Sequence, residues 1–252
     1  MEFDYIVVGA GSAGCVLARR LTEDPSVSVL LLEAGSKDSN PWIHIPAGFI
    51  KTLSDPSVNW LYQSEPEAAT LNRPIPIPRG KVLGGSSSIN GMLYIRGQHR
   101  DYDIWSQLGN KGWSFDEVLP YFKRSENQER GGDEWHGEGG PLNVCDQNEK
   151  DNVVCDAVIA AAEAVGIPRN NDVNGADQEG FGYCQLTVRK ARRNSTAAAY
   201  LDPVRYRKNL TIMTNAQATR VLLDGKRAVG VEYDRGGTRM EARAGAEGLL
   251  SG

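Results

Sequence analysis

The sequence is poor in the features that mark several classes of protein. Its four cysteines are scattered, and no two form a C-x-x-C pair, so we expect neither a disulfide framework nor a zinc knuckle. No apolar run is long enough to span a bilayer, and residues 1–4 lead into a strand without the regions of a secretory signal. We therefore predict a cytoplasmic chain, at most peripheral to the inner membrane. The cysteines are Cys15, Cys145, Cys155 and Cys184.

An excess of basic residues is also missing. Lys and Arg number 28 against 32 Asp and Glu, a net charge of -4, which argues against a nucleic-acid partner. The 252 residues, 40% hydrophobic, suffice for one full domain and part of a second. A small-molecule partner is the better expectation.

Histidine is rarer still, with only three residues. His44, His99 and His136 lie in loop-like stretches beside Pro, Gly or charged residues, and none stands at a metal-ligand spacing from another ligand. We predict no metal site and expect all three side chains to cap helices or face solvent. No G-x-S-x-G elbow of a hydrolase is present either.

The N-terminus instead carries a dinucleotide-binding pattern. Residues 5–8 read as a strand buried on both faces, and Gly9, Gly11 and Gly14 follow as G-x-G-x-x-G with Ser12 and Ala13 between them. Apolar residues at helical spacing come next, then a second buried strand over residues 27–32 that ends at Glu33. The strand, turn, helix and strand predict a nucleotide site.

Each glycine of this motif has an expected role. Gly9 permits the tight turn, Gly11 lets the backbone approach a pyrophosphate, and Gly14 lets the helix pack against the strand. The helix N-terminus offers N–H donors to phosphates, and Glu33 is placed to hold a ribose hydroxyl. This unit alone leaves FAD and NAD equally open.

A second glycine-rich element spans residues 79–91, Arg-Gly-Lys-Val-Leu-Gly-Gly-Ser-Ser-Ser-Ile-Asn-Gly. It is too rich in glycine and serine for a helix interior and lacks the order of a P-loop. Taken alone, it is either a solvated loop or a backbone segment that approaches a phosphate or a flavin ring.

Together, the two elements resemble the glucose-methanol-choline (GMC) oxidoreductase family, in particular its choline and alcohol dehydrogenases. The likeness extends over the whole chain and includes Asn59-Trp60, residues 94–97, Trp113-Ser114 and residues 180–182. It implies an α/β fold, an FAD-binding Rossmann-like domain with a β-meander and part of an α+β substrate domain. It also implies oxidation of a primary alcohol, with hydride passing to flavin N5 and electrons then passing to oxygen, a quinone or a dye.

The resemblance also implies the cofactor contacts. The ADP part of FAD would lie over the first motif and Glu33, the second element would run beside the pyrophosphate and isoalloxazine, and Val221 would touch the adenine. Ile89 stands where some relatives attach FAD through a histidine, so we expect non-covalent FAD. The full expected set is Gly9, Gly11, Ser12, Ala13, Gly14, Glu33, Ala34, Trp60, Gly80, Val82, Gly85, Ser86, Asn90, Gly91, Met92, Leu93 and Val221.

Three segments are expected along the chain: residues 1–150 as the first part of the FAD domain, 151–204 as a partial substrate domain, and 205–252 as a return to the FAD domain. A capping box, Ser114-x-x-Glu117, opens one helix, and an apolar stripe over residues 153–165 predicts another packed on a core. Three strands joined at Asp224-Gly225 and Gly236-Gly237 predict a meander over one side of the nucleotide-binding sheet.

The family's catalytic histidine and its partner belong to the C-terminal half, so no residue of this sequence is assigned a catalytic role. The expected function is that of a piece of a flavin-dependent alcohol dehydrogenase. Two alternatives stay open, a non-catalytic FAD-binding remnant and a nicotinamide-dependent dehydrogenase, and the second element disfavours the latter.

Overall fold

The computed structural model describes residues 1–147 and 152–252. They form two compact units, the first of residues 1–91 and 191–252 and the second of residues 92–190. The boundaries of these units differ from those of the three segments expected from the sequence. Those three segments remain a prediction of functional domains. Each unit is described by itself.

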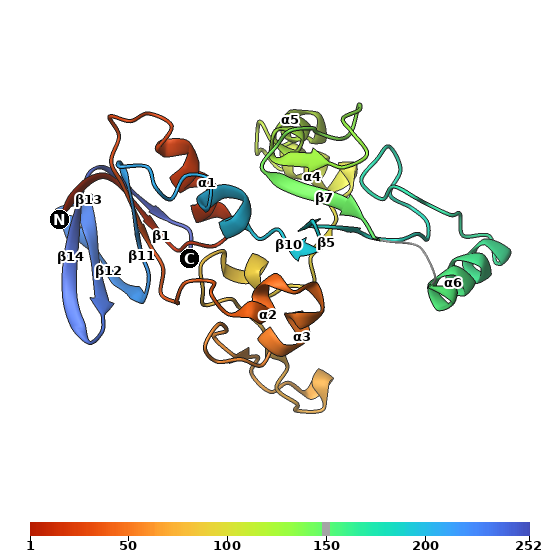
Figure 1. Ribbon diagram of the computed structural model, residues 1–252, viewed down its shortest axis with the longest axis horizontal. Helices are drawn as coiled ribbons and strands as arrows, with labels where there is room; N and C mark the ends of the chain where they lie inside the picture. Colours follow the sequence, from red (N-terminus) through yellow and green to blue (C-terminus); the bar gives the residue numbers. More distant parts are fainter. Residues whose placement is uncertain (148–151) are drawn as a thin grey trace. The chain divides into compact units, whose positions relative to one another are not determined.

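The first unit is built on a six-stranded sheet in the order β11-β2-β1-β14-β13-β12 (Figure 1). Neighbouring strands from β11 to β14 are parallel, and β14, β13 and β12 are antiparallel. The strands are β1 (Glu2–Val8), β2 (Val29–Leu32), β11 (Leu210–Met213), β12 (Ala216–Asp224), β13 (Arg227–Arg235) and β14 (Thr238–Leu250). The predicted α/β class, opening unit and meander are confirmed.

Helix α1 (Ser12–Leu21) packs beside the parallel strands, with Gly14 next to Val7 of β1, and its Cys15 and Ala18 are fully buried. All four residues of β2 are buried, as expected for a strand covered on both faces. The alternation of side chains along a strand explains why one short apolar run supplies both faces.

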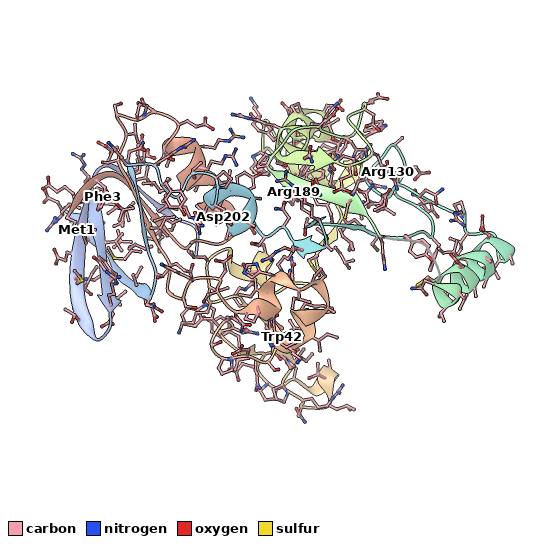
Figure 2. All side chains as sticks on the ribbon, in the orientation of Figure 1. Met1, Phe3, Trp42, Arg130, Arg189 and Asp202 are labelled. Atoms are coloured by element: carbon pink, nitrogen blue, oxygen red, sulfur yellow. The ribbon has the colours of Figure 1, made fainter. Side chains whose placement is uncertain are left out.

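The meander covers one face of the parallel strands. Ile6 and Leu30 of the parallel strands share a buried core with Val231 and Tyr233 of β13, although β2 and β13 are not neighbours in the sheet. The sheet therefore curls, and the meander both extends it beside β1 and covers the parallel strands. Phe3, labelled in Figure 2, packs against this core.

The remainder of the first unit consists of short elements, and four of its residues, Ile43, Val58, Val82 and Ile89, form a small second core. Ile89 is thus a buried apolar residue of the second glycine-rich element. The elements are α2 (Pro41–His44), η1 (Pro46–Gly48), α3 (Phe49–Thr52), β3 (Tyr62–Gln63), η2 (Ala68–Thr70), β4 (Pro76–Ile77), η3 (Gly85–Ser88), β10 (Arg192–Arg193) and η4 (Ala197–Leu201).

The second unit contains a four-stranded sheet in the order β5-β8-β7-β6. The predicted capping box is confirmed at the start of α5, where the backbone N–H and the hydroxyl of Ser114 donate to the Glu117 carboxylate at 3.0 and 2.7 Å. The elements are β5 (Leu93–Tyr94), α4 (His99–Gln107), α5 (Phe115–Ser125), β6 (Glu126–Gln128), β7 (Leu142–Asp146), α6 (Val153–Ala164), β8 (Gln185–Leu186) and β9 (Val188–Arg189).

The predicted helix at residues 153–165 is present as α6, but its packing was predicted wrongly. Ile159 and Ala162 are buried, whereas Val153, Val154 and Val158 are exposed. Apolar residues occupy most positions around this helix, so their spacing could not identify the packed face.

The environment expected for one histidine, His136, is also wrong. His136 is buried, with Nδ1 3.1 Å from Glu126 Oε1 and Nε2 2.9 Å from Asp172 Oδ2. The Arg96 guanidinium donates to Glu126 Oε2 at 2.8 Å. Sequence spacing gave no signal for this network, because its members come together only through tertiary packing.

The other two histidines are half-buried. The His99 ring stacks on Phe115, and His44 Nε2 lies 2.7 Å from the backbone oxygen of Asp38. No group of side chains able to hold a metal occurs within residues 1–147 and 152–252. No helix of those two ranges has the length and apolar character needed to cross a bilayer.

The His136 network predicts a loss of stability at alkaline pH. Hydrogen bonds to Asp172 and Glu126 raise the pKa of His136 from 6.5 to about 9, against the opposing effect of burial. A raised folded-state pKa stabilises the fold fully below pH 6.5, and that stabilisation is lost as the pH rises through about 9. We expect the free energy of unfolding to fall by on the order of 3 kcal/mol across this range.

Urea denaturation of the chain at pH 6 and at pH 9.5 measures this fall. In His136→Gln the same pH change should have much less effect, because glutamine does not titrate. An equally steep pH dependence in that variant would assign the effect to other groups.

Candidate functional site

A cavity of about 820 Å³ opens at the carboxyl ends of the parallel strands of the first unit. Val8 ends β1, Leu32 ends β2, and Ser251 follows β14, and all three line the cavity. Parallel strands with their carboxyl ends at one edge form the usual ligand crevice of an open α/β sheet. This arrangement identifies the cavity as the candidate site.

The structure brings nine of the predicted contact residues together at this cavity. They come from both glycine-rich elements, from the end of β2 and from the segment before β3. These nine are Gly9, Gly11, Ser12, Glu33, Ala34, Trp60, Gly80, Gly85 and Ser86.

Nine further residues line the cavity without having been predicted. The strand-end rule could have indicated Val8 and Leu32, because residues 5–8 and 27–32 were expected to form buried parallel strands. The side chains of Tyr62 and Arg79 had no sequence signal. The nine are Val8, Leu32, Tyr62, Arg79, Ala216, Gln217, Ala218, Ser251 and Gly252.

The remaining predicted contacts do not line this cavity. Val221 lies on β12, whose residues Ala216, Gln217 and Ala218 line the cavity instead. Met92 and Leu93 belong to the second unit. Others lie within the first unit away from the cavity surface: Ala13, Gly14, Val82, Asn90 and Gly91. Their contacts with a cofactor stay a prediction.

The two glycine-rich elements touch each other. The Gly84 N–H donates to the Ala10 carbonyl at 2.7 Å, and a Cβ added to Gly85 would lie 2.7 Å from Gly11 Cα. Any side chain at Gly85 would therefore force the elements apart, and its φ of +53° also disfavours one. The sequence predicted two separate backbone segments near a ligand, and the structure joins them into one wall.

The N-terminus of α1 lies at this wall, and no side chain caps its backbone N–H groups. Gly11 is the N-cap residue and Ser12 begins the helix, and both line the cavity. The predicted tight packing of the helix is confirmed at Gly14, where a Cβ would lie 1.9 Å from the Gly9 carbonyl oxygen. A helix N-terminus with free N–H groups favours an anion such as a phosphate.

Glu33 is buried at the end of β2 and has a structural role at the cavity wall. Its carboxylate accepts the Ala10 N–H at 2.9 Å and the Gly35 N–H at 2.8 Å. Burial raises the pKa of Glu33, and these two backbone donors act in the opposite sense. Each oxygen still has a second lone pair, so the carboxylate can hold the first glycine turn and accept a ligand hydroxyl.

One cationic side chain, Arg79, lines the cavity beside Trp60 and Tyr62, whose rings stack with centroids 5.8 Å apart. The Lys81 ammonium lies 4.2 Å from the centroid of the Trp60 ring. The cavity thus combines aromatic faces, a guanidinium, backbone donors and one carboxylate. This combination suits a ligand with a ring system, phosphates and hydroxyls.

The sequence profile of the family described as GMC oxidoreductase matches residues 3–251. The chain belongs to this family. The resemblance found in the sequence is therefore confirmed.

Individual relatives agree with this assignment. The chain is 46% identical to "Choline dehydrogenase, mitochondrial" of Mus musculus over 258 aligned residues, which cover 100% of this chain and 43% of the relative. Pyridoxine 4-oxidase from "Mesorbium loti" superposes with a TM-score of 0.94 at 36% identity, over 98% of this chain and 49% of that one.

A third relative, an FAD-dependent oxidoreductase from Chaetomium thermophilum, has a TM-score of 0.89 at 32% identity over 98% of this chain and 45% of its own. The folds of these two solved structures support the Rossmann-like FAD-binding architecture. The chain spans slightly less than half the length of each of these three relatives.

Proposed function

We propose that the chain binds FAD without a covalent bond and forms the cofactor-binding part of an oxidoreductase acting on a primary alcohol, choline or a related one. The observation that carries the proposal is the contact between the two glycine-rich elements at one cavity wall. A family match, an FAD-dependent structural relative and a choline dehydrogenase relative support it.

The residues of the cavity fit FAD. The uncapped α1 N-terminus and the bare backbone at Gly11 suit the pyrophosphate, and Glu33 retains lone pairs for a ribose hydroxyl. Arg79 adds positive charge for an anionic ligand. Bound FAD supplies a hydride acceptor for alcohol oxidation, and the chain's own residues bind and orient it.

Ile89 supports the non-covalent part of the proposal. Its side chain is buried in the core with Ile43, Val58 and Val82, and a hydrocarbon offers no nucleophile for a bond to flavin. The electron acceptor, whether oxygen, a quinone or a dye, belongs to the proposed activity of the whole protein.

The alternative is a non-catalytic FAD-binding remnant, because no residue of this chain is identified as a catalytic base. Both functions require FAD. A nicotinamide dehydrogenase requires NAD in the same cavity.

The test is to purify the chain, titrate it separately with FAD and with NAD, and follow flavin absorbance and fluorescence. We expect FAD to bind and NAD not to compete, and we expect acid denaturation to release all flavin into the supernatant. Flavin that stays on the polypeptide would contradict the non-covalent proposal, and tight NAD binding would contradict the FAD assignment. The mass of the native protein, and dye reduction with choline by that native protein, then separate the enzyme from the remnant.

A further inference from the structure

Arg193 is a buried cation whose bonds all go to neutral groups. Its side chain is 3% exposed, and Nε donates to the Ile43 carbonyl at 2.7 Å. Nη1 donates to the Ser87 carbonyl at 3.1 Å and to Asn90 Oδ1 at 2.8 Å. One guanidinium thus joins α2 to two positions of the second glycine-rich element.

No carboxylate within residues 1–147 and 152–252 pairs with this guanidinium, and its Nη2 atom is buried without a hydrogen-bond partner there. Burial lowers the pKa of Arg193 to about 10. A buried charge without a counter-ion is costly to the fold, and an apolar side chain of similar volume is often better tolerated. Stability alone is therefore a poor reason for an arginine at this position.

The bond to Asn90 fixes the orientation of an amide. A guanidinium has only donors, so the Asn90 side chain must present Oδ1 to Arg193 and keep its Nδ2 donors on the opposite side. An aliphatic residue at 193 would remove the donor that holds Asn90 Oδ1 in this direction. Arg193 thus constrains the orientation of the Asn90 amide.

The segment that contains Arg193, residues 193–196, also holds the Gly85–Ser88 turn, which reaches the cavity. The Thr196 N–H donates to Ser87 Oγ at 3.0 Å, and the Ser87 and Thr196 hydroxyls lie 2.9 Å apart. Gly85 and Ser86, directly before Ser87, line the cavity. Contacts made by residues 193–196 therefore act one residue away from the wall of the candidate site.

We propose that Arg193 is a positioning residue for FAD, which fixes the Asn90 amide and the Gly85–Ser88 turn in the conformation that the cofactor needs. The inference rests on the proposed function, because FAD is the ligand whose binding it serves. Arg193 itself acts through Asn90 and Ser87. The planar arrangement of its guanidinium donors, rather than the positive charge alone, holds these two residues in place.

The experiment is a double-mutant cycle on FAD affinity, with Arg193→Met, Asn90→Ala and the double variant, measured by quenching of flavin fluorescence. We expect each single change to weaken FAD binding about tenfold, and the double change to fall well short of the hundredfold product, because both single changes remove the same Arg193–Asn90 contact. Effects that multiply to about a hundredfold would show that Arg193 does not act through Asn90.

Arg193→Lys separates geometry from charge, since lysine keeps the cation but cannot span three acceptors in a plane. It should bind FAD as weakly as Arg193→Met; recovery of normal affinity would overturn the role of the planar donor arrangement. The exposed neighbour supplies the matched control, Arg192→Met, which should bind FAD normally.

Two further outcomes distinguish this inference from the function on which it rests. If the unchanged chain fails to bind FAD, the proposed function is refuted, and the positioning role falls with it. If the unchanged chain and Arg193→Met bind FAD equally, only the positioning role is refuted. Urea denaturation of each variant without FAD corrects the affinities for the folded fraction, and Arg193→Lys supplies the comparison if the methionine variant does not fold.

Discussion

Replacing Glu126 with alanine should lower the free energy of unfolding by about 3 to 5 kcal/mol. Glu126 is fully buried, and its carboxylate accepts from the Arg96 guanidinium and the Gly137 N–H, each at 2.8 Å, and contacts the His136 ring. Its loss leaves a buried guanidinium without its carboxylate and an amide without an acceptor. Urea denaturation followed by circular dichroism measures the change.

Glu138→Ala is the matched control for this experiment, since Glu138 is exposed in the same loop as His136. It should change stability by less than about 0.5 kcal/mol. Glu126→Gln should fall between the two, because the amide oxygen still accepts hydrogen bonds but carries no charge. Equal stability of Glu126→Ala and the control would mean that the network contributes nothing to the fold.

Replacing Gly11 with valine should abolish FAD binding, with at least a hundredfold increase in Kd, or about 2.7 kcal/mol. A Cβ at Gly11 meets nothing closer than 4.0 Å, and the backbone at φ -77° accepts any residue, so the fold should tolerate the change. Gly11 lines the cavity, so the branched side chain would occupy the space of the ligand. Isothermal titration with FAD measures the loss.

Substitutions at two other glycines serve as comparisons for the Gly11→Val result. Gly248→Val places the same side chain on an exposed position of β14 with nothing within 4 Å of the Cβ, and FAD affinity should not change. Gly85→Ala should instead lower stability before any ligand is added, because its Cβ would meet Gly11 Cα. Retention of FAD by Gly11→Val would remove the first motif from the site.

Local patterns were sufficient for the elements whose chemistry lies within a few neighbouring residues. The apolar run before Gly9, the spacing of Gly11 and Gly14 and the helix after them predict a strand, a turn and a helix, since backbone sterics act over short distances. The meander followed from turn residues in the same way. The capping box at Ser114 needed only the spacing to Glu117.

Contacts between distant segments were decided only by tertiary structure. Glu126, His136 and Asp172 meet in a buried network, and Arg193 reaches Asn90 across about a hundred residues of chain, with no local pattern to indicate either. The sequence by itself determined the α/β class and both glycine-rich elements, because close backbone approach demands glycine at fixed spacing. Only folding decided that these elements touch, and which buried charges find partners, because such contacts depend on where whole segments pack rather than on neighbouring residues.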